Sequence, residues 1–477
     1  MKKLFICLAL GAFTAIGHCS EQPLVWPQFR GPNGSGVADG QKPPLEIGPE
    51  KNLKWKVPVP GGLSSPIVAG DKLVMTAFEG GKLYTIAYDR TDGREVWRTE
   101  APAKRLEAFH KTEGSPAAST PATDGKQIVS YFGSCGLFCY DLTGKELWKV
   151  EMPPAELFGE FGSGVSPIIA EDMVILVRDQ KKNSKIYSFD LATGVIRWEH
   201  NRKSPVSYCT PIVWKTSEDQ QIVAAGHARI VGYDLKTGTE KWSAGNVPAG
   251  CCSSPVAAGN NLFFAGGSPG ESEDTEPQMP SFDSMLTDLD RDKDGALSRD
   301  EAEKAFEGFF DNQDADKDGR ITRDEWEAIS KLYSEGKNSA FALRPRGSGD
   351  VTESHVLWKQ TKGLPYVPSA IVYRGNYIMV KDGGIVTAYD ATTGERKFQE
   401  RAAQPGTYYA SPVAANGHVY LASLEGDLTV MKVDAGKLVV VASTKLGERT
   451  AATPAIADDT LFIRTEQHLY AFAERKE

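Results

Sequence analysis

Short alternations of apolar and polar residues, separated by tight turns, fill most of this chain. Residues 232–242 read Gly-Tyr-Asp-Leu-Lys-Thr-Gly-Thr-Glu-Lys-Trp and show the repeating unit most completely. An alternating strand leads into an Asp-x-x-Thr-Gly turn, and a second strand ends in Trp. The Asp carboxylate can accept hydrogen bonds from backbone N–H groups of the turn, and Gly adopts the positive φ that the last turn position needs. The segment therefore predicts a β-hairpin.

The same hairpin recurs along the sequence. Copies stand at Tyr88-Asp89 with Gly93 and Trp97, Tyr140-Asp141 with Gly144 and Trp148, Phe189-Asp190 with Gly194 and Trp198, Tyr389-Asp390 with Gly394 and Phe398, and more weakly at Asp434-Ala435-Gly436. A single hairpin is only marginally stable in water, so the recurrence indicates units that bury one another's faces. We expect the recurring Trp to pack between neighbouring units.

A second marker precedes each hairpin, namely a short apolar strand opened by Ser-Pro, Thr-Pro or a close variant. It stands at eight places: Pro66, Pro121, Pro167, Pro211, Pro255, Pro368, Pro412 and Pro454. Most of the markers are about 45 residues apart, and each heads several short strands, which is the pattern of a β-propeller. The longer interval after Pro255 indicates that the fifth unit carries an insertion. The sequence therefore predicts an all-β fold, an eight-bladed β-propeller.

The two ends of the chain are predicted to complete one blade together. The copy that begins at Pro454 runs to Phe472 and has no turn or Trp after it. Near the N-terminus, Leu53, Trp55 and Val57 lie on one face of a short alternating strand. We expect this strand to close the last blade and so to remove exposed sheet edges. The preceding residues 26–36 show no period and predict a turn-rich arm.

The first twenty residues have the design of a signal peptide. Lys2 and Lys3 precede an apolar run over residues 4–16, which is too short to span a bilayer, and small and polar residues follow. We expect export to the periplasm or the extracellular space, with outer-membrane association as the alternative in which Cys19 carries a lipid. Removal of the leader would leave five of the seven cysteines, so at least one thiol is free or pairs between chains.

Charge is distributed unevenly along the 477 residues. The net charge is −9, and residues 271–345 alone hold 21 Asp and Glu against 10 Lys and Arg. No basic stripe of the kind that binds nucleic acid is present, so we expect no nucleic-acid partner. No segment after the leader is long and apolar enough for a membrane helix, so we expect no transmembrane span in the mature chain.

The acidic region breaks the β pattern and contains a repeated motif. Helical periodicity over residues 282–289 precedes a twelve-residue segment at 290–301, and a second segment of the same design follows at 314–325. Both look like EF-hand calcium loops. We therefore divide the chain into a signal peptide (1–20), a first propeller part (21–269), a small α-helical EF-hand pair inserted in blade five (270–345) and a second propeller part (346–477).

Oxygen ligands at EF-hand spacing predict two Ca²⁺ sites, because Ca²⁺ is a hard cation that prefers many oxygen ligands. Gly295 and Gly319 permit the sharp bend in each loop, and the residue after each Gly offers its carbonyl. Only residues 302–313 separate the loops, too few for an exit helix, a linker and an entry helix, so we expect structural rather than sensor sites. The predicted ligands are Asp290, Asp292, Asp294, Ala296, Ser298 and Glu301 in the first loop, and Asp314, Asp316, Asp318, Arg320, Thr322 and Glu325 in the second.

The Tyr-Asp-x-x-Thr-Gly-x-x-x-Trp repeats over residues 24–269 and 346–477 resemble the bacterial PQQ-like propeller repeat family. That family includes the outer-membrane assembly factor BamB and the quinoprotein alcohol dehydrogenases. The resemblance implies eight four-stranded blades. It also implies a reading of the vicinal pair Cys251 and Cys252, since quinoproteins of the family hold a disulfide of adjacent cysteines over PQQ.

Three interpretations of the cysteine pair stay open: free thiols, a structural disulfide, or a weak candidate for binding a cofactor. The Glu, Asn and Asp that accompany a quinone in the family have no assignable counterparts here, so no catalytic residue is predicted. Further polar candidates near the blade ends, expected to be ordinary rim residues, are His110, Tyr208, Lys381, Asp382, Tyr408 and Tyr409.

We therefore expect an exported, monomeric, calcium-binding propeller that serves as a non-enzymatic binding or scaffold module for other envelope or extracellular proteins. Ca²⁺ at two sites is the expected cofactor. The alternative function is that of a PQQ-dependent alcohol or sugar oxidoreductase.

Overall fold

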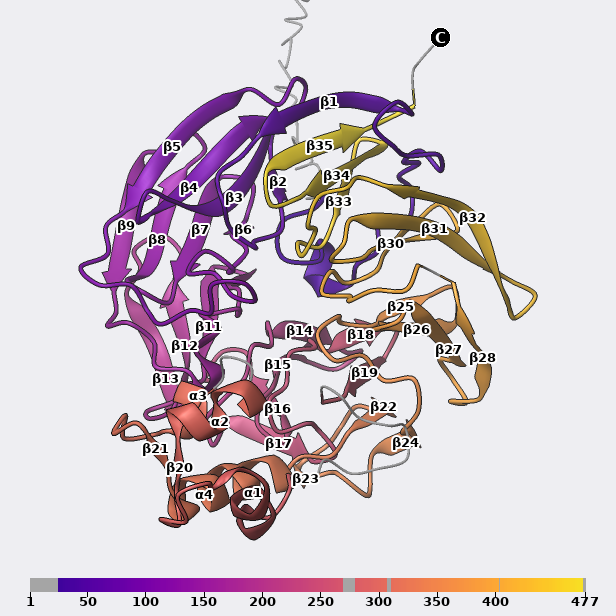
Figure 1. The fold of residues 1–477 in the computed structure, drawn as a ribbon. Coiled ribbons are helices and arrows are strands. Elements are labelled where there is room, and N and C mark those ends of the chain that lie inside the picture. The colour runs from indigo at the N-terminus through magenta and orange to yellow at the C-terminus, as the bar shows by residue number, and fades with distance from the viewer. Residues whose placement is uncertain (1–24, 269–278, 307–309, 403, 475–477) are drawn as a thin grey trace, which may run out of the picture.

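The computed structural model describes residues 25–268, 279–306, 310–402 and 404–474; the predicted signal peptide lies outside the described residues. Eight sheets stand around a central axis, and the strand that follows each marker proline is the one nearest to the axis (Figure 1). Because hairpin connections place successive strands side by side, the strand order follows the sequence in seven sheets, and in the eighth the N-terminal β1 adds at the outer edge. The predicted eight-bladed, all-β propeller is confirmed.

The strands of the first four blades are as follows. Blade one contains β2 (Ile67–Ala69), β3 (Lys72–Glu79), β4 (Lys82–Asp89) and β5 (Glu95–Ala101). Blade two contains β6 (Ala122–Thr123), β7 (Gln127–Phe132), β8 (Gly136–Asp141) and β9 (Glu146–Glu151). Blade three contains β10 (Ile168–Ala170), β11 (Met173–Arg178), β12 (Lys185–Asp190) and β13 (Ile196–Asn201). Blade four contains β14 (Ile212–Lys215), β15 (Gln220–Ala225), β16 (Ile230–Asp234) and β17 (Glu240–Ala244), to which β23 (Gly349–Asp350) adds in parallel.

The other four blades follow the same plan. Blade five contains β18 (Val256–Ala258), β19 (Asn261–Gly266), β22 (Ser339–Leu343) and β24 (Val356–Gln360). Blade six contains β25 (Ile371–Tyr373), β26 (Asn376–Lys381), β27 (Ile385–Asp390) and β28 (Arg396–Arg401). Blade seven contains β29 (Val413–Ala415), β30 (His418–Ala422), β31 (Asp427–Asp434) and β32 (Lys437–Lys445). Blade eight contains β33 (Ala455–Ala457), β34 (Thr460–Arg464), β35 (His468–Phe472) and, from the N-terminal region, β1 (Leu53–Pro58).

The two ends of the chain close the propeller as the sequence predicts. Strand β1 pairs antiparallel with β35, with Trp55 opposite Ala471 and Val57 opposite Leu469. Residues about 400 positions apart in the chain thus share one sheet, as the indigo β1 beside the yellow β35 shows (Figure 1). The last blade therefore has the same four strands as the others.

A ring of hydrogen bonds joins all eight blades near the axis. In each blade a backbone N–H donates to a Ser or Thr hydroxyl oxygen of the next blade, with N···O distances of 2.9 to 3.1 Å. All of these residues are buried, and in seven blades they directly precede the marker proline. Blade six is the exception, because Ser369 follows Pro368 instead of preceding it. The sixth marker predicted from the sequence is therefore corrected from Pro368 to Ser369. The ring consists of Ser65, Thr120, Ser166, Thr210, Ser254, Ser369, Ser411 and Thr453.

The recurring Trp residues join the blades at the periphery. The Trp148 ring of blade two packs on Gly194 of the blade-three turn, and its indole N–H donates to the Leu191 carbonyl at 2.8 Å. A Cβ on Gly194 would lie 2.6 Å from that ring, and its φ is 73°, so the turn requires glycine for two reasons. The same contact recurs between Trp55 and Gly93, Trp97 and Gly144, Trp198 and Gly238, and Trp358 and Gly394.

The N-terminal arm crosses one end of the axis. It includes the short 3-10 helix η1 (Pro32–Gly34) and bonds to the innermost strands of four blades. Backbone N–H groups of blades one, two and seven donate to its carbonyls, each at 2.8 Å, and the Asn33 amide exchanges two hydrogen bonds with the Val213 backbone of blade four. The three N–H groups belong to Val68, Thr123 and Ala414, and their acceptors are Trp26, Pro27 and Gly36. The arm therefore covers the end of the axis where these strands terminate.

A helical segment lies between β19 and β22 of blade five. It contains α1 (Phe282–Leu289), β20 (Leu297–Ser298), α2 (Arg299–Phe306), α3 (Phe310–Gln313), β21 (Arg320–Ile321) and α4 (Arg323–Ser334). Its own small core includes Phe282, Leu297, Phe310, Ile321 and Trp326. The sequence placed the end of this insertion at residue 345, whereas propeller pairing already resumes at Ser339. The expectation that the residues between the two loops are too few for two helices was wrong, because α2 follows the first loop and the short α3 precedes the second. Within the described residues, no helix has the length and apolar character needed to cross a bilayer.

Candidate functional site

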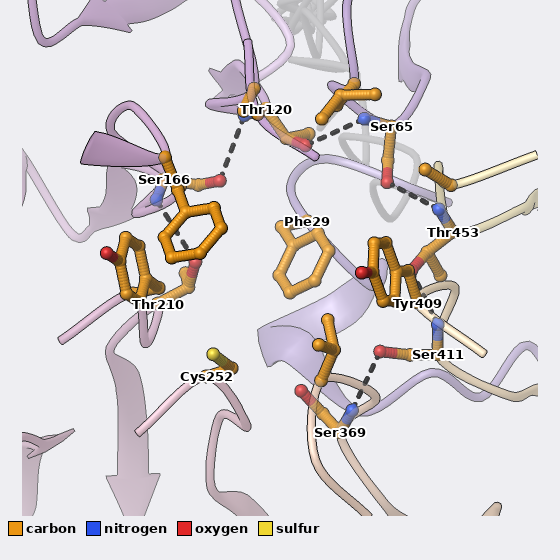
Figure 2. Close-up of a pocket in the computed structure, with 18 of the residues that line it drawn as sticks. Phe29, Ser65, Thr120, Ser166, Thr210, Cys252, Ser369, Tyr409, Ser411 and Thr453 are labelled. Atoms are coloured by element: carbon orange, nitrogen blue, oxygen red, sulfur yellow. Dashed lines mark hydrogen bonds between the residues drawn. The ribbon is translucent and has the colours of Figure 1, made fainter. Parts of the chain in front are cut away.

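A pocket of about 200 Å³ lies on the propeller axis, inside the hydrogen-bond ring (Figure 2). Seven of the eight ring residues line it, all except Ser254. Phe29 of the N-terminal arm also lines the pocket, and because the arm covers that end of the axis, Phe29 forms the floor. The pocket is therefore built by the same residues that hold the blades together.

Aromatic side chains form the walls of this axial pocket. Phe161, Tyr208, Tyr366 and Tyr409 line it, each from a loop that connects the outer strand of one blade to the inner strand of the next. Phe161 and Tyr208 meet edge to face, with ring centroids 6.2 Å apart. The Tyr208 hydroxyl donates at 2.7 Å to the carbonyl of Phe158, which is the first residue of the 3-10 helix η2 (Phe158–Glu160). The walls are thus apolar, and the polar tip of Tyr208 already has an acceptor.

The pocket carries little charge. Among the described residues that line it, only Glu113 is charged at neutral pH. Its carboxylate accepts a hydrogen bond from the Tyr409 hydroxyl and lies 3.5 Å from the Arg449 guanidinium. Burial, followed by the Glu113 carboxylate, raises the pKa of Tyr409, so this phenol stays protonated and donates. The charge of Glu113 is therefore already compensated by neighbouring side chains.

The vicinal cysteines are free thiols in different surroundings. Cys252 lines the pocket, whereas Cys251 is buried beside Cys209 in the core of blades four and five. The Cys209 thiol donates to the Cys251 carbonyl at 3.2 Å and to the Ser253 carbonyl at 3.1 Å. Burial raises the pKa of the Cys252 thiol, which keeps it protonated at neutral pH. Only one of the two candidate residues therefore faces the axis.

The pocket lining does not fit PQQ. That quinone is a polyanion of carboxylates, and a buried anion needs cationic or donor partners. The described lining holds no Lys, Arg or His, and its single charged group is the Glu113 carboxylate. The floor is Phe29.

The remaining polar candidates make structural contacts. The Tyr408 N–H donates to the Asp382 carboxylate at 2.8 Å, and the Tyr408 hydroxyl donates to the Gln404 carbonyl at 3.0 Å. The His110 ring lies against Phe161 with centroids 6.0 Å apart, and Lys381 ends strand β26. Of the six rim candidates, only Tyr208 and Tyr409 line the axial pocket.

The helical segment brings acidic side chains together at two places, which we name the first acidic loop (residues 290–301) and the second acidic loop (residues 314–325). In the first loop, one carboxylate oxygen each of Asp290, Asp292 and Glu301 lies within 4.8 Å of the others. The second loop repeats this arrangement with Asp314, Asp316 and Glu325. Asp294 instead pairs with the Arg320 side chain, and Asp318 accepts the Arg320 backbone N–H at 2.8 Å.

Local hydrogen bonds position the closing glutamate of each acidic loop. The Glu301 carboxylate accepts from the Ser298 backbone N–H at 2.9 Å and from the Ser298 hydroxyl at 2.7 Å. Glu325 does the same with Thr322 at 2.8 and 2.7 Å, which forms a capping box at the start of α4. The loops stand side by side because β20 and β21 pair through Leu297 and Ile321. The two acidic loops thus form similar clusters of carboxylates on either side of this short strand pair.

In the first acidic loop, hydrogen bonds stabilise the charge of one carboxylate, whereas neighbouring carboxylates repel the charge of another. Hydrogen bonds from Ser298 hold the pKa of Glu301 at about 2, so this carboxylate is ionised at neutral pH. Desolvation and the neighbouring carboxylates raise the pKa of Asp292. Clustered carboxylates with oxygen donors alone are ligands for a hard divalent cation such as Ca²⁺, which would relieve this repulsion.

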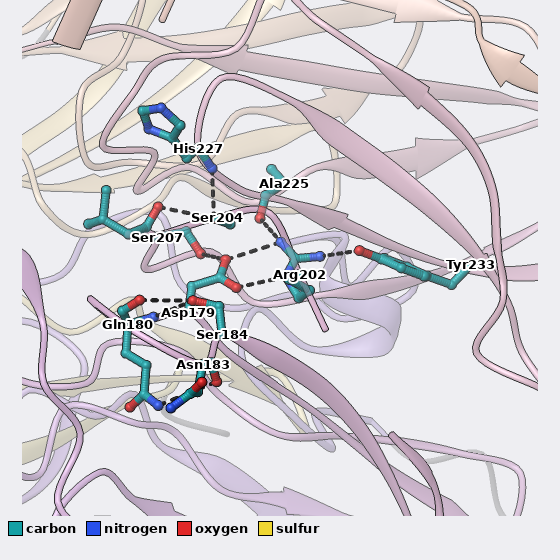
Figure 3. A network of polar contacts seen from close by, with 11 residues as sticks. Asp179, Gln180, Asn183, Ser184, Arg202, Ser204, Ser207, Ala225, His227 and Tyr233 are labelled. Atoms are coloured by element: carbon teal, nitrogen blue, oxygen red, sulfur yellow. Dashed lines mark hydrogen bonds and ion pairs between the residues drawn. The ribbon is translucent and has the colours of Figure 1, made fainter. Parts of the chain in front are cut away.

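A buried ion pair lies between blades three and four (Figure 3). The Arg202 guanidinium donates to the Asp179 carboxylate at 2.7 and 3.1 Å, and Ser207 donates to the same carboxylate at 2.6 Å. A third guanidinium nitrogen of Arg202 donates to the Tyr233 oxygen of blade four at 2.6 Å. Both charged side chains are almost fully buried, so the pair depends on this complete set of partners.

Comparison with known proteins agrees with this fold. The family model described as Outer membrane protein assembly factor BamB matches residues 84–270 and 347–477. The chain belongs to that family. The two matched parts of this BamB-family chain flank the segment that contains both acidic loops. No curated protein sequence matches it.

Solved structures share the fold at low sequence identity. BamB from Moraxella catarrhalis has a TM-score of 0.53 at 12% identity, covering 88% of this chain and 97% of that chain. A europium-containing methanol dehydrogenase has a TM-score of 0.59 at 11% identity, covering 95% and 99%. The quinohemoprotein alcohol dehydrogenase from Comamonas testosteroni has a TM-score of 0.52 at 12% identity, covering 94% and 81%. At these identities the likeness extends to the fold alone.

Sequence reasoning missed a buried carboxyl group next to the pocket. Glu107 is 3% exposed, and its carboxylate accepts from the Ser163 hydroxyl at 2.6 Å. The other carboxylate oxygen has no hydrogen-bond partner among the described residues. Burial raises the pKa of Glu107 to about 7. Gly133 packs directly on this group, since a Cβ there would lie 2.1 Å from the carboxylate. In the sequence, the one signal for this buried group is Gly133, whose missing side chain leaves room for the carboxylate.

The protonation of Glu107 should make the protein less stable as the pH rises. In the unfolded chain its pKa is near 4.5, so between about pH 4.5 and 7 only the folded state keeps the proton. Stability should therefore fall across this window and then level off for this group. Glu107→Gln should remove that fall and gain roughly 2–3 kcal/mol at pH 8, measured by urea unfolding at several pH values. Equal pH slopes for Glu107→Gln, the exposed control Glu146→Gln and the parent would contradict the assignment.

Proposed function

We propose that this protein is an exported, calcium-binding member of the BamB family that acts by binding other proteins of the cell envelope rather than by catalysis. The observation that carries the proposal is the convergence of three carboxylate oxygens in each acidic loop. Oxygen donors of this number and spacing, closed by a glutamate after a sharp glycine turn, suit Ca²⁺. The positive φ values of Gly295 and Gly319, 84° and 87°, supply those turns.

The ligand set extends beyond the three carboxylates in each loop. Asp294 and Asp318 supply the third aspartate, and Ala296 and Arg320 offer backbone carbonyls. Ser298 and Thr322 hold the position where a water often completes the shell. The Arg320 side chain now pairs with one Asp294 carboxylate oxygen, and Ca²⁺ would compete with it for this carboxylate. We propose that both cations stabilise the segment rather than drive a catalytic step.

The axial pocket supports a binding role. Its ring hydroxyls already accept backbone N–H groups, and Tyr208 and Tyr409 already donate to oxygen acceptors. Polar groups that are committed in this way can position a guest but are poor proton donors and acceptors for chemistry. The aromatic walls suit an uncharged aromatic or aliphatic side chain of a partner protein, inserted from the face opposite the N-terminal arm. We propose a monomer that offers this pocket to its partners.

The proposed location follows from the first residues of the sequence. A positively charged start and a short apolar run are the marks of export, and the family matched is an outer-membrane assembly factor. We propose the periplasm or the extracellular space, with attachment to the outer membrane if Cys19 is lipidated.

Calcium titration tests the acidic loops. Isothermal calorimetry of the full chain should show two calcium sites, because each loop offers a complete oxygen shell. Glu301→Gln and Glu325→Gln should each weaken one site by at least about tenfold, since each removes the ligand that supplies two oxygens. Glu327→Gln, an exposed residue of α4 outside the ligand set, serves as the control. Unchanged binding in both loop variants would show that the ligands are misassigned.

Capture of partners tests the envelope role. The full chain, used as bait on a solubilised envelope fraction, should retain a defined set of envelope proteins, and Tyr366→Ala and Phe161→Ala should lose them because they open the pocket walls. A surface change remote from the pocket, Lys149→Ala, should not. Quinone absorbance and dye reduction with alcohols, after PQQ and calcium are added, would contradict the proposal and favour the oxidoreductase alternative.

A further inference from the structure

The end of the helical segment is fixed to the loop that leads to the vicinal cysteines. Gly336 packs so closely on Ala249 that a Cβ would lie 2.2 Å from the Ala249 nitrogen. The next residue, Lys337, donates its N–H to the Val247 carbonyl at 3.0 Å. Residues 247–250 continue directly into Cys251 and Cys252, so a movement of α4 reaches the wall of the axial pocket through the backbone.

Side chains of α4 and its C-terminal cap strengthen this attachment. The Glu335 carboxylate lies 3.0 Å from one ring nitrogen of His227, and the other ring nitrogen lies 2.9 Å from the Ala249 carbonyl. His227 also donates its backbone N–H to the Ser204 hydroxyl at 2.8 Å, within the polar network of blades three and four (Figure 3). Glu335, Gly336 and Lys337 together hold the end of the helical segment against residues 247–249.

The second acidic loop contacts η2, which directly precedes the pocket wall at Phe161. Lys317 of this loop forms an ion pair with Glu160 of η2, with the ammonium 3.2 Å from the carboxylate. Glu160 directly precedes Phe161, which lines the pocket, and the Phe158 carbonyl holds the hydroxyl of Tyr208. Helix α3, just before the second acidic loop, also packs on η2. One ion pair thus connects the acidic loop to two wall residues.

The first acidic loop offers a natural comparison. Lys293 occupies the position in the first loop that Lys317 occupies in the second, and the two have left-handed backbones of φ 61° and 63°. Within the described ranges, the structure gives Lys293 no ion pair with the propeller. The contact with the pocket wall is therefore a property of the second loop and not of the repeated motif.

The position of Lys317 depends on the carboxylates on either side of it. Asp316 and Asp318 flank it, and the Asp318 backbone N–H donates to both Asp314 and Asp316 at 3.1 Å. Without a cation these carboxylates repel one another, whereas a bound divalent cation would hold them and Lys317 in place. Cation occupancy and the Lys317–Glu160 contact are thus parts of one arrangement.

We propose that a divalent cation in the second acidic loop controls access to the axial pocket, through the Lys317–Glu160 ion pair and the docking of the end of the helical segment on residues 247–249, which lead to Cys252. This inference rests on the calcium sites of the proposed function. With the cation bound, the helical segment is docked beside the pocket wall. Without it, the segment detaches from η2 and the pocket opens.

The thiol of Cys252 reports this opening directly. Cys252 is partly exposed, whereas Cys135, Cys139, Cys209 and Cys251 are buried. The full chain is treated with 4,4′-dithiodipyridine in calcium or in chelator, and modification of the peptide that contains Cys252 is followed by mass spectrometry. Calcium should slow the modification by at least about tenfold, because the reagent then reaches Cys252 only when the docked segment opens locally. Cys252→Ser confirms the assignment of the peptide.

Matched variants separate the contact from cation binding. Lys317→Ala should keep two calcium sites by calorimetry but lose most of the protection of Cys252, whereas Lys293→Ala should keep both. Glu160→Gln should behave like Lys317→Ala, because it removes the same ion pair from the propeller side. Glu325→Gln should lose one calcium site and the protection together.

The outcomes distinguish the two proposals. Two calcium sites with an unchanged modification rate would overturn the inference and leave the proposed function standing. Equal protection in Lys317→Ala and Lys293→Ala would overturn the role of the ion pair. The absence of calcium binding in the parent chain would overturn the proposed function itself.

Discussion

At every junction between neighbouring blades, a backbone N–H donates to a buried Ser or Thr hydroxyl, and the eight junctions close into one ring around the axis. Each donor has one acceptor, in the following blade, so the ring sets the height of every inner strand relative to its neighbours. A buried N–H without an acceptor is costly, which makes the ring sensitive to each member. The axial pocket lies inside this ring and takes its shape from it.

At the periphery, contacts between a Trp and a turn Gly join neighbouring blades. The described residues of the junction to blade five, which carries the insertion, lack this contact. Five tryptophans pack on the turn glycine of the next blade, but Trp242 of blade four does not. Its indole donates to Gln221 at 2.6 Å, and its side chain lies near Gly347, because blade five has no Asp-x-x-Thr-Gly turn. The helical segment enters between β19 and β22, away from the hydrogen-bond ring. The blade can therefore carry a second module, with its own core, beside the mouth of the pocket.

The amino-acid sequence predicted the blades better than the pocket, and the reasons are physical. Turn chemistry and the Ser/Thr-Pro markers repeat because every junction repeats the same contacts, whereas the wall aromatics lie in loops that follow no period. The marker in blade six was misplaced because the group common to all eight blades is the hydroxyl, here that of Ser369, and not the ring of Pro368. Strand β22 was missed because its residues are buried on both faces and show no alternation. The acidic loops could be located from spacing alone, but their contact with η2 could not.

The most direct test of the ring is the free energy of unfolding in urea for two serine variants of blade three. Ser166→Ala removes the acceptor of the Thr120 N–H, whereas Ser188 is equally buried and its hydroxyl has no partner among the described residues. Ser166→Ala should cost about 1–3 kcal/mol, whereas Ser188→Ala should not lower the free energy of unfolding, because it removes no hydrogen bond. Equal effects of the two substitutions, or no loss for Ser166→Ala, would contradict the claim that the hydroxyl ring holds the blades together.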